Sequence, residues 1–187
     1  MKRIIPVLLL LFLFTPNLYG ADKPKQGGTL PDLKLAGSLQ AENLIYLGTE
    51  NSGPDLSLSN IKSEYVLIEV FSMYCPFCQK EAPHINELFK MILASDKKDL
   101  VKMIGIGVGN SQFEVDLYRK KYSVEFPLFT DADFSLHKEI GEVGTPYFIL
   151  AKKKGDNTYE VLLTQEGPFK DLKAFYQSII DSVNPSK

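Results

Sequence analysis

Two near-continuous runs of apolar residues stand out along the chain, at residues 65–71 and 100–108. Such runs are typical of strands that are covered on both faces of a sheet. Between them, residues 76–94 repeat apolar side chains at helical spacing. One face of this helix would carry Ile85, Leu88, Phe89 and Ile92. The pattern therefore predicts a right-handed strand–helix–strand crossover.

The rest of the chain continues the alternation of strands and helices. Ser111 is followed three residues later by Glu114, which is typical of a capped helix start, and Asp131 or Asp133 is suited to cap another helix. The further elements expected are a strand at 44–47, a helix from Ser111 to about Tyr122, a strand at 126–129, a helix ending at Ile140, strands at 146–151 and 159–164, and a helix at 169–183. Together they predict a layered α/β domain with a mixed central sheet flanked by helices.

The first 20 residues have the features of a secretory signal peptide, with two basic residues, an apolar stretch at 4–14 and small residues near the expected cleavage site. The alternative is an uncleaved anchor, but a spanning helix needs roughly 20 apolar residues and this stretch is shorter. Residues 21–29 are polar and rich in glycine and lysine, so we expect a flexible leader there. A single domain would then occupy residues 30–187.

The net charge of the chain limits which classes of partner are expected. The chain carries 21 basic and 23 acidic residues. Loss of the expected signal peptide removes two basic residues and leaves four more acidic than basic residues. Nucleic acids and anionic membrane surfaces are therefore not expected partners, and no membrane span is expected after cleavage. Export to the periplasm or another extracytoplasmic compartment would let disulfides persist.

The chain has two cysteines, Cys75 and Cys78, which lie between the apolar run at 65–71 and the helix at 76–94. Their spacing puts both sulfurs on one helical turn, and a helix N-terminus stabilises a thiolate on the first. A structural disulfide across so short a loop would add little stability by chain entropy. The pair therefore predicts a redox-active dithiol in which Cys75 attacks and Cys78 resolves, with no cofactor besides the Cys75–Cys78 disulfide.

Four motifs lie in a fixed order along the chain. They are Gly28-Thr29-Leu30-Pro31-Asp32-Leu33, then Cys75-Pro76-Phe77-Cys78 with Glu81 and Pro83, then the segment 111–140, and last Val143-Gly144-Thr145-Pro146. Over about residues 28–183 the chain resembles the TlpA/ResA-like periplasmic thiol–disulfide oxidoreductases of the thioredoxin superfamily. The resemblance implies a thioredoxin-like fold with an extra strand and helix inserted before a cis-proline loop.

The resemblance also implies roles for residues around the dithiol. Pro146 is expected to be cis and to lie beside Cys75, so that the Thr145 backbone pairs with an extended substrate strand. Tyr74 stands where such proteins usually carry Trp. Tyr74, Phe71 and Phe77 would present an apolar rim to a partner protein, unless Phe71 belongs to the core.

Two acids are candidates for moving protons to and from Cys78. Glu69 lies inside an otherwise apolar strand, where thioredoxins carry a buried acid, and burial raises the pKa of a carboxyl. Glu81 follows Cys78 by three residues and lies either near the dithiol or on a solvated helix face. His84 and His137 are interpreted as structural, since neither has a second ligand at metal-binding spacing, and no metal site is expected.

The expected activity is the reduction of disulfides in exported proteins. The thiols of apocytochrome c are one candidate substrate, and a membrane electron donor would restore the dithiol. A disulfide oxidase or isomerase is the alternative within the same chemistry, because reduction potentials differ widely among proteins of this fold.

Other functions fit the motif less well. A non-enzymatic Cu(I) chaperone remains an alternative, although copper-handling relatives on this fold usually carry Cys-x-x-x-Cys and a histidine. Haem attachment is excluded because Gln79, not His, follows the second cysteine. A peroxiredoxin site does not match, because Ile68 occupies the position seven before Cys75 where such a site needs an upstream proline.

Overall fold

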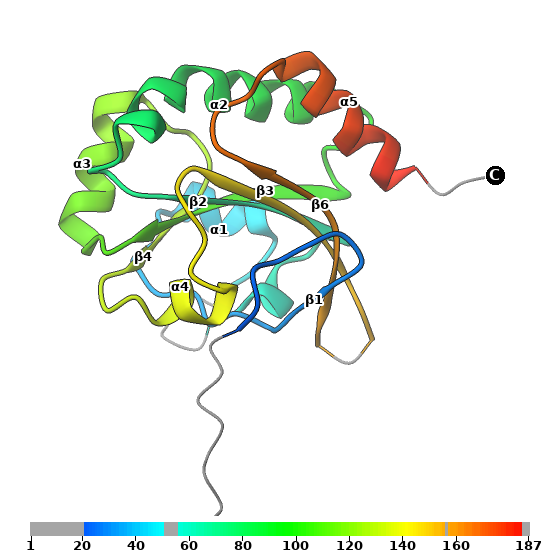
Figure 1. Ribbon diagram of the computed structural model, residues 1–187, viewed down its shortest axis with the longest axis horizontal. Helices are drawn as coiled ribbons and strands as arrows, with labels where there is room; N and C mark the ends of the chain where they lie inside the picture. Colours follow the sequence, from blue (N-terminus) through cyan, green and yellow to red (C-terminus); the bar gives the residue numbers. More distant parts are fainter. Residues whose placement is uncertain (1–20, 51–55, 156, 185–187) are drawn as a thin grey trace, which may run out of the picture.

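The computed structural model describes residues 21–50, 56–155 and 157–184. These residues form a six-stranded sheet in the order β1–β6–β5–β2–β3–β4, with helices on both faces (Figure 1). The strands are β1 (Thr29–Leu30), β2 (Tyr65–Phe71), β3 (Val101–Val108), β4 (Leu128–Asp131), β5 (Tyr147–Lys153) and β6 (Tyr159–Glu166). The helices are α1 (Ala41–Leu47), α2 (Pro76–Ala94), α3 (Gln112–Tyr122), α4 (Ser135–Ile140) and α5 (Leu172–Val183), with a 3-10 turn at Leu58–Asn60. The signal peptide expected at residues 1–20 lies outside the described residues.

The central strand β2 joins the parallel and antiparallel halves of the sheet. β3 runs parallel to β2 and β4 runs parallel to β3. On the other side, β5, β6 and β1 each run antiparallel to their neighbour. The helix α2 connects β2 to β3, as the predicted crossover requires. All seven residues of β2 are buried, which confirms the apolar run as a strand covered on both faces.

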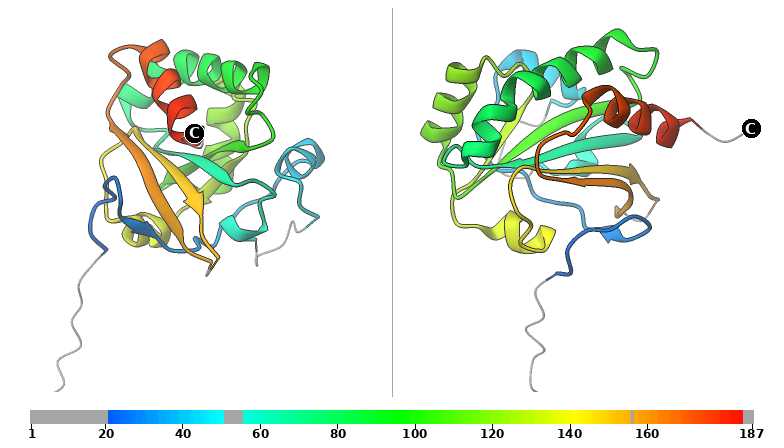
Figure 2. Two further views of the ribbon diagram at one scale, coloured as in Figure 1. Left: turned by 90° about the vertical axis from the view of Figure 1, so that its right-hand side faces the viewer. Right: turned by 45° about the horizontal axis from the view of Figure 1, so that its top comes forward.

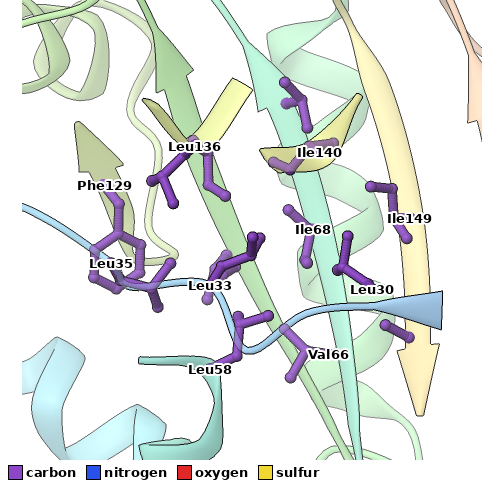
Figure 3. Close-up of a cluster of buried hydrophobic side chains, with 14 of the residues drawn as sticks. Leu30, Leu33, Leu35, Leu58, Val66, Ile68, Phe129, Leu136, Ile140 and Ile149 are labelled. Atoms are coloured by element: carbon purple, nitrogen blue, oxygen red, sulfur yellow. The ribbon is translucent and has the colours of Figure 1, made fainter. Parts of the chain in front are cut away.

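The two faces of the sheet carry separate hydrophobic clusters. Leu67 and Phe71 of β2 pack with buried residues of α2, α3 and α5, which lie together on one side of the sheet in Figure 1 and Figure 2. Val66, Ile68 and Val70 point to the opposite face, because successive strand residues alternate. They pack with buried residues of α4 and β1, and Figure 3 shows part of this second cluster. The predicted layered, mixed α/β architecture is confirmed.

The prediction of a strand at residues 44–47 was wrong, because these residues belong to the helix α1. Gly48 ends the helix in the left-handed conformation, with φ 66°, and its N–H bonds to carbonyls of the last turn. Helical spacing buries Asn43 and Leu47, while Ile45 is 80% exposed. A short apolar run fits either a strand or a helix. Gly48, which follows the run directly, is typical of a helix C-terminus and would have favoured the helix.

Two other boundaries differ slightly from the prediction. β4 begins at Leu128, two residues after the predicted start, and Pro127 before it has no N–H to donate to a sheet. Asp131 and Asp133 both accept hydrogen bonds from N–H groups at the start of α4. Both acids considered as caps therefore contribute, while Phe134 holds the N-cap position in a left-handed conformation.

The stretch expected as a flexible leader lies against β6. The Gly27 N–H donates to the Val161 carbonyl at 2.8 Å, and the Val161 N–H donates to the Gly28 carbonyl at 2.9 Å. Thr29 and Leu30 then pair antiparallel with β6 as β1. The described part of this stretch therefore extends the edge of the sheet. In the part of the chain that the structure describes, no helix is long and apolar enough to cross a membrane.

Candidate active site

The dithiol lies at the junction between the central strand β2 and the helix α2. After Phe71 the chain turns, with the Cys75 N–H donating to the Ser72 carbonyl at 3.0 Å, and α2 begins at Pro76. Cys75 is the N-cap residue, and its sulfur accepts a hydrogen bond from the Cys78 N–H at 3.3 Å. Proline fits the first helical position because an N–H there would have no helical partner. The predicted order of strand, dithiol and helix is confirmed.

The two sulfurs have different surroundings. Cys75 is partly exposed, whereas Cys78 is completely buried. Burial raises the pKa of the Cys75 thiol, but side-chain hydrogen bonds with Thr145 and Cys78 and two backbone N–H groups of α2 outweigh it, so this pKa falls below its ordinary value. Burial, the hydrogen bond with Cys75 and the charge of Glu69 raise the pKa of Cys78. Cys75 is therefore the sulfur that ionises more readily.

Thr145 and Pro146 lie beside Cys75, as the resemblance implied. The Cys75 thiol donates to the Thr145 carbonyl at 3.2 Å. The Thr145–Pro146 peptide bond is cis, and Pro146 directly precedes β5, the neighbour of β2 in the sheet. Gly144 is exposed and Thr145 is partly exposed, while Pro146 is buried, so a partner can reach this loop at Gly144 and Thr145.

Aromatic side chains and a small cavity surround the exposed sulfur. Tyr74 is 65% exposed and Phe77 is 59% exposed, whereas Phe71 is completely buried and belongs to the core. The Tyr74 hydroxyl also donates a hydrogen bond to the Glu114 carboxylate. A cavity of about 210 Å³ is lined by Phe77, Gly144, Thr145, Pro146, Glu166, Gly167 and Pro168. Tyr74 and Phe77 are therefore exposed beside Cys75, while Phe71 is not available to a partner.

Glu69 is buried on the face of the sheet that packs against α2. It is 1% exposed, and one of its carboxylate oxygens has no hydrogen-bond partner among the described residues. Burial, followed by the charges of Glu81 and Cys75, raises the pKa of Glu69 to about 8. The carboxyl is therefore mainly protonated at neutral pH. Burial is the largest cause of the raised pKa of Cys78, and the negative charge of an ionised Glu69 raises it further. Glu69 and the dithiol therefore interact electrostatically.

Glu81 does not lie on a solvated helix face, since it is 4% exposed. Its Oε1 accepts a hydrogen bond from the Phe169 N–H at 3.2 Å and lies 3.4 Å from His84 Nδ1. Phe169 lies between β6 and α5, so Glu81 connects the first half of α2 to that loop. Among the described residues no hydrogen bond joins Glu81 to a cysteine. Its link to the dithiol is its charge, which adds to burial in raising the pKa of Glu69.

Three further side chains form hydrogen bonds with the backbone around the dithiol. The sequence analysis assigned them no role there. Asn110 Oδ1 accepts the Met73 N–H at 2.8 Å, and Gln79 Nε2 donates to the Met73 carbonyl at 2.7 Å. The Tyr118 hydroxyl donates to the Cys78 carbonyl at 3.0 Å. Asn110 and Tyr118 are 37 and 40 residues from their partners. No local sequence pattern marks these two contacts, because Asn110 meets its partner through the pairing of β2 with β3 and Tyr118 through the packing of α3.

The two histidines make structural contacts. The His84 side chain is 59% exposed and pairs with Glu81. A ring nitrogen of His137 lies 2.8 Å from the Val143 carbonyl oxygen. Within the described ranges, no group of three or more His, Cys, Asp or Glu side chains is arranged to hold a metal ion.

Comparison with known sequences finds relatives with one shared chemistry. Residues 26–160 match the AhpC/TSA family. The thiol-disulfide oxidoreductase ResA of Bacillus thuringiensis subsp. konkukian (strain 97-27) is 25% identical over 159 residues, which cover 85% of each chain. The sporulation thiol-disulfide oxidoreductase A of Bacillus subtilis (strain 168) is 28% identical over 141 residues, covering 71% of this chain and 80% of the relative.

Comparison with solved structures shows the fold. A thiol:disulfide interchange protein DsbE from Chlorobium tepidum is similar with a TM-score of 0.65 at 19% identity, covering 86% of this chain and 99% of that chain. StoA from Bacillus subtilis has a TM-score of 0.55 at 22% identity, covering 83% and 98%. The fold is therefore thioredoxin-like.

Proposed function

We propose that this chain, which belongs to the AhpC/TSA family and is a thiol–disulfide oxidoreductase, reduces disulfides of exported proteins through Cys75 and Cys78. The observation that carries the proposal is the asymmetry of the dithiol. A partly exposed sulfur with a lowered pKa caps the helix α2, and a buried sulfur with a raised pKa lies one turn further on. This asymmetry supports an attacking Cys75 and a resolving Cys78.

The exchange would proceed in two displacement steps. The Cys75 thiolate attacks one sulfur of a partner disulfide, the partner's S–S bond breaks, and its second sulfur leaves and takes up a proton. Cys78 then gives up its proton and attacks the Cys75 sulfur. The Cys75–Cys78 disulfide forms and the partner's first sulfur leaves and is protonated. Two electrons pass from the dithiol to the partner, which ends as a dithiol.

The second step needs a proton acceptor for Cys78, because its raised pKa leaves it a thiol at neutral pH. Glu69 is our candidate for this relay. Its pKa of about 8 means that both the acid and the carboxylate are present near neutral pH, as a proton relay requires. Glu81 is the weaker candidate, because its carboxylate oxygen is engaged by the Phe169 N–H.

The partner would approach over the cis-proline loop. The Thr145 carbonyl already lies against the Cys75 sulfur, and an extended peptide can bind by pairing its backbone with the exposed backbone of this loop. Tyr74 and Phe77 flank this path with exposed aromatic surface. Aromatic side chains of this kind carry much of the binding energy in protein interfaces. The substrate is therefore an extended segment of protein that carries a disulfide.

The pKa values of the two cysteines act on the direction of electron flow in opposite ways. A fold-mate becomes a strong oxidant when its reduced form is strongly stabilised. Here burial and the Glu69 carboxylate disfavour a thiolate on Cys78, and burial opposes the N–H groups that favour one on Cys75. The lowered pKa of Cys75 stabilises the reduced form, whereas the raised pKa of Cys78 does not. The proposal of a reductant over an oxidase or isomerase therefore rests on the resemblance to the TlpA/ResA-like proteins.

The cellular setting is part of the same proposal. A reductant in the periplasm, or outside the cytoplasm generally, needs an electron supply, for which a membrane dithiol donor is the expected source. Apocytochrome c thiols are one candidate substrate, because haem attachment requires both cysteines of its Cys-x-x-Cys motif in the reduced state. The excess of acidic residues does not favour anionic membrane surfaces or nucleic acid as partners.

The decisive measurement is the reduction potential of the Cys75–Cys78 couple, obtained by equilibrating the purified protein in glutathione buffers. A reductant is expected to lie close to the thioredoxin value of about −270 mV, and a value close to the DsbA value of about −120 mV would overturn the direction. The Cys75→Ser variant is the matched control, since it cannot form the disulfide.

Anaerobic titration with Cu(I) tests the alternative role as a metal chaperone. Two thiolates can bind Cu(I), so weak binding alone would not distinguish the two functions. A tight stoichiometric complex in a protein without disulfide exchange activity would reject the enzyme proposal. Rapid exchange with only weak copper binding would support it.

A further inference from the structure

The backbone N–H and the backbone carbonyl of Met73 are each hydrogen-bonded to a side chain. Its N–H donates to Asn110 Oδ1 at 2.8 Å, and its carbonyl accepts from Gln79 Nε2 at 2.7 Å. Met73 lies two residues before Cys75, in the turn that carries the attacking sulfur. Because the turn leaves the sheet at Phe71, its own ladder hydrogen bonds have ended. The side-chain amides of Asn110 and Gln79 therefore supply the hydrogen bonds that a neighbouring strand would otherwise make with Met73.

Asn110 is placed with little freedom. It is 0% exposed, and it follows Gly109, which has φ 64° and leaves no room for a Cβ next to the Phe134 ring. A Cβ on Gly107 would come within 3.2 Å of Asn110 Oδ1, so glycine also makes room for the amide. Two glycines and complete burial fix this amide under the turn. A polar side chain held so closely is a stiff support.

A second contact holds the other cysteine. The Tyr118 hydroxyl on α3 donates to the Cys78 carbonyl at 3.0 Å, and the Tyr118 ring packs against Phe71 with ring centroids 4.6 Å apart. Tyr118 is 2% exposed. α3 lies next to α2 in Figure 2, so its buried face reaches the first turn of that helix. The two contacts come from one continuous segment, residues 109–122.

We propose that Asn110 and Tyr118 are positioning residues that hold the two cysteines in register, Asn110 through the Met73 peptide on the Cys75 side and Tyr118 through the carbonyl on the Cys78 side. The inference rests on the proposed roles of Cys75 and Cys78. It adds that two residues of the segment 109–122 act on different steps of the exchange. Asn110 serves the attack on a partner, and Tyr118 serves the resolution of the mixed disulfide.

The physical reason is geometric. The N–H groups of α2 favour the Cys75 thiolate only while the sulfur stays at the N-cap, where the Cys78 N–H lies 3.3 Å away. Release of the Met73 peptide would let the turn drift from that position. Loss of the hydrogen bond to the Cys78 carbonyl would instead loosen the first turn of α2. The Cys78 sulfur would then be aligned less often for attack on the mixed disulfide.

The test uses 5,5′-dithiobis(2-nitrobenzoate), a small disulfide that reports each step separately. The first equivalent of thionitrobenzoate is released when Cys75 attacks, and the second when Cys78 resolves the mixed disulfide. Asn110→Ala is expected to slow the first release about three- to tenfold, the effect of losing one hydrogen bond. It should also shift the alkylation profile of Cys75 to higher pH. Tyr118→Phe is expected to slow the second release by a similar factor and leave the first unchanged.

Tyr122→Phe is the matched control, because it removes a hydroxyl from the same helix. The Tyr122 hydroxyl makes no hydrogen bond with any residue that the structure describes, so both releases should match the wild type. Asn110→Ser replaces Asn110→Ala if the latter does not fold. Unchanged rates and alkylation profiles in folded variants at both positions would overturn the inference. Equal slowing of both steps in Tyr118→Phe would also overturn it, because that result indicates general loosening.

The proposed function fails in a different way. In that case the wild-type protein itself would release no second equivalent, or Cys75→Ser would still exchange. Those results concern the cysteines alone. The wild-type protein and Cys75→Ser are therefore measured before the variants at positions 110 and 118.

Discussion

The sulfur of Cys75 lies 3.2 Å from the carbonyl oxygen of Thr145, although the two residues are 70 positions apart. The contact arises because β2 and β5 are antiparallel neighbours in the sheet. The end of β2 therefore meets the start of β5, where the cis Thr145–Pro146 bond lies. A protein strand that pairs with Thr145 would bring its own sulfur to Cys75. The sheet order thus places Thr145 beside Cys75, while N–H groups of α2 contribute to the lowered pKa of the sulfur.

Replacement of the resolving cysteine should trap the partner. In Cys78→Ser the attacking sulfur remains, so we expect mixed disulfides to accumulate, visible by mass spectrometry or on non-reducing gels. Cys75→Ser should give none, because the buried sulfur at position 78 is inaccessible and has a raised pKa. Trapping by Cys75→Ser with no trapping by Cys78→Ser would reverse the two roles.

The Glu69 carboxyl should make the protein less stable as pH rises. Its folded pKa of about 8 lies above the unfolded value, so the protonated form stabilises the fold fully below the unfolded pKa of about 4.3. Between that value and pH 8, the free energy of unfolding should fall by up to about 1.4 kcal/mol per pH unit from this group. Chemical denaturation at pH 5, 7 and 8.5 measures the slope.

Glu69→Gln should flatten this slope, because the amide does not ionise. Glu87→Gln is the control, since it removes an exposed carboxylate from α2 and should leave the slope unchanged. An identical pH dependence in wild type and Glu69→Gln would show that Glu69 does not carry the raised pKa. If Glu69 relays protons, Glu69→Gln should also lower the pKa of Cys78 in alkylation profiles, although burial remains the larger cause of its rise.

The bond between Tyr74 and Glu114 should matter for protein substrates more than for small ones. The Tyr74 hydroxyl, with the Ser111 contacts, lowers the pKa of Glu114, so the carboxylate is the form that holds the ring. Glu114→Gln should reduce kcat/KM for insulin disulfides about two- to fivefold, as expected for one weakened hydrogen bond at an exposed site. The rate with a small aromatic disulfide should stay the same.

Glu114 also caps α3 through Ser111, so its replacement has a structural effect as well. Thermal unfolding of Glu114→Gln measures that effect separately, and Tyr74→Phe removes the hydroxyl without touching the cap. The two variants should give the same selective loss with insulin. Equal loss with both substrates would mean that the bond supports the dithiol itself rather than the rim.

Gly105 in β3 should not tolerate a side chain. A Cβ there would lie 2.5 Å from Leu128 Cδ2 and 3.3 Å from both the Phe126 and Phe71 rings. Overpacking of a core in this way costs about 1–3 kcal/mol, so Gly105→Ala should lower the free energy of unfolding by that amount. Gly155→Ala is the control, because nothing lies within 4 Å of its Cβ position. Equal stability of the two variants would contradict the tight packing of β3 against β4.

The dithiol and its immediate setting could be predicted from the sequence because they are local. The apolar run at 65–71, the spacing of Cys75 and Cys78 and the helical period that follows all act within a few residues of one another. The same holds for the Ser111 cap of α3, where Glu114 lies only three residues away. Local signals failed where they were ambiguous, as at 44–47, where four apolar residues fit a strand as well as the helix observed.

The tertiary structure alone decided what surrounds the dithiol. Whether Glu81 was buried depended on the Phe169 loop, which lies 88 residues further along the chain. The contact of Asn110 depended on the pairing of β2 with β3, and the contact of Tyr118 on the packing of α3 against α2 and β2. Such contacts leave no mark in a local pattern, because each side chain meets its partner only after the sheet has brought distant segments together. The sequence by itself determined that Cys75 and Cys78 are the candidate redox pair, and the packing of distant segments decided which residues surround the two sulfurs.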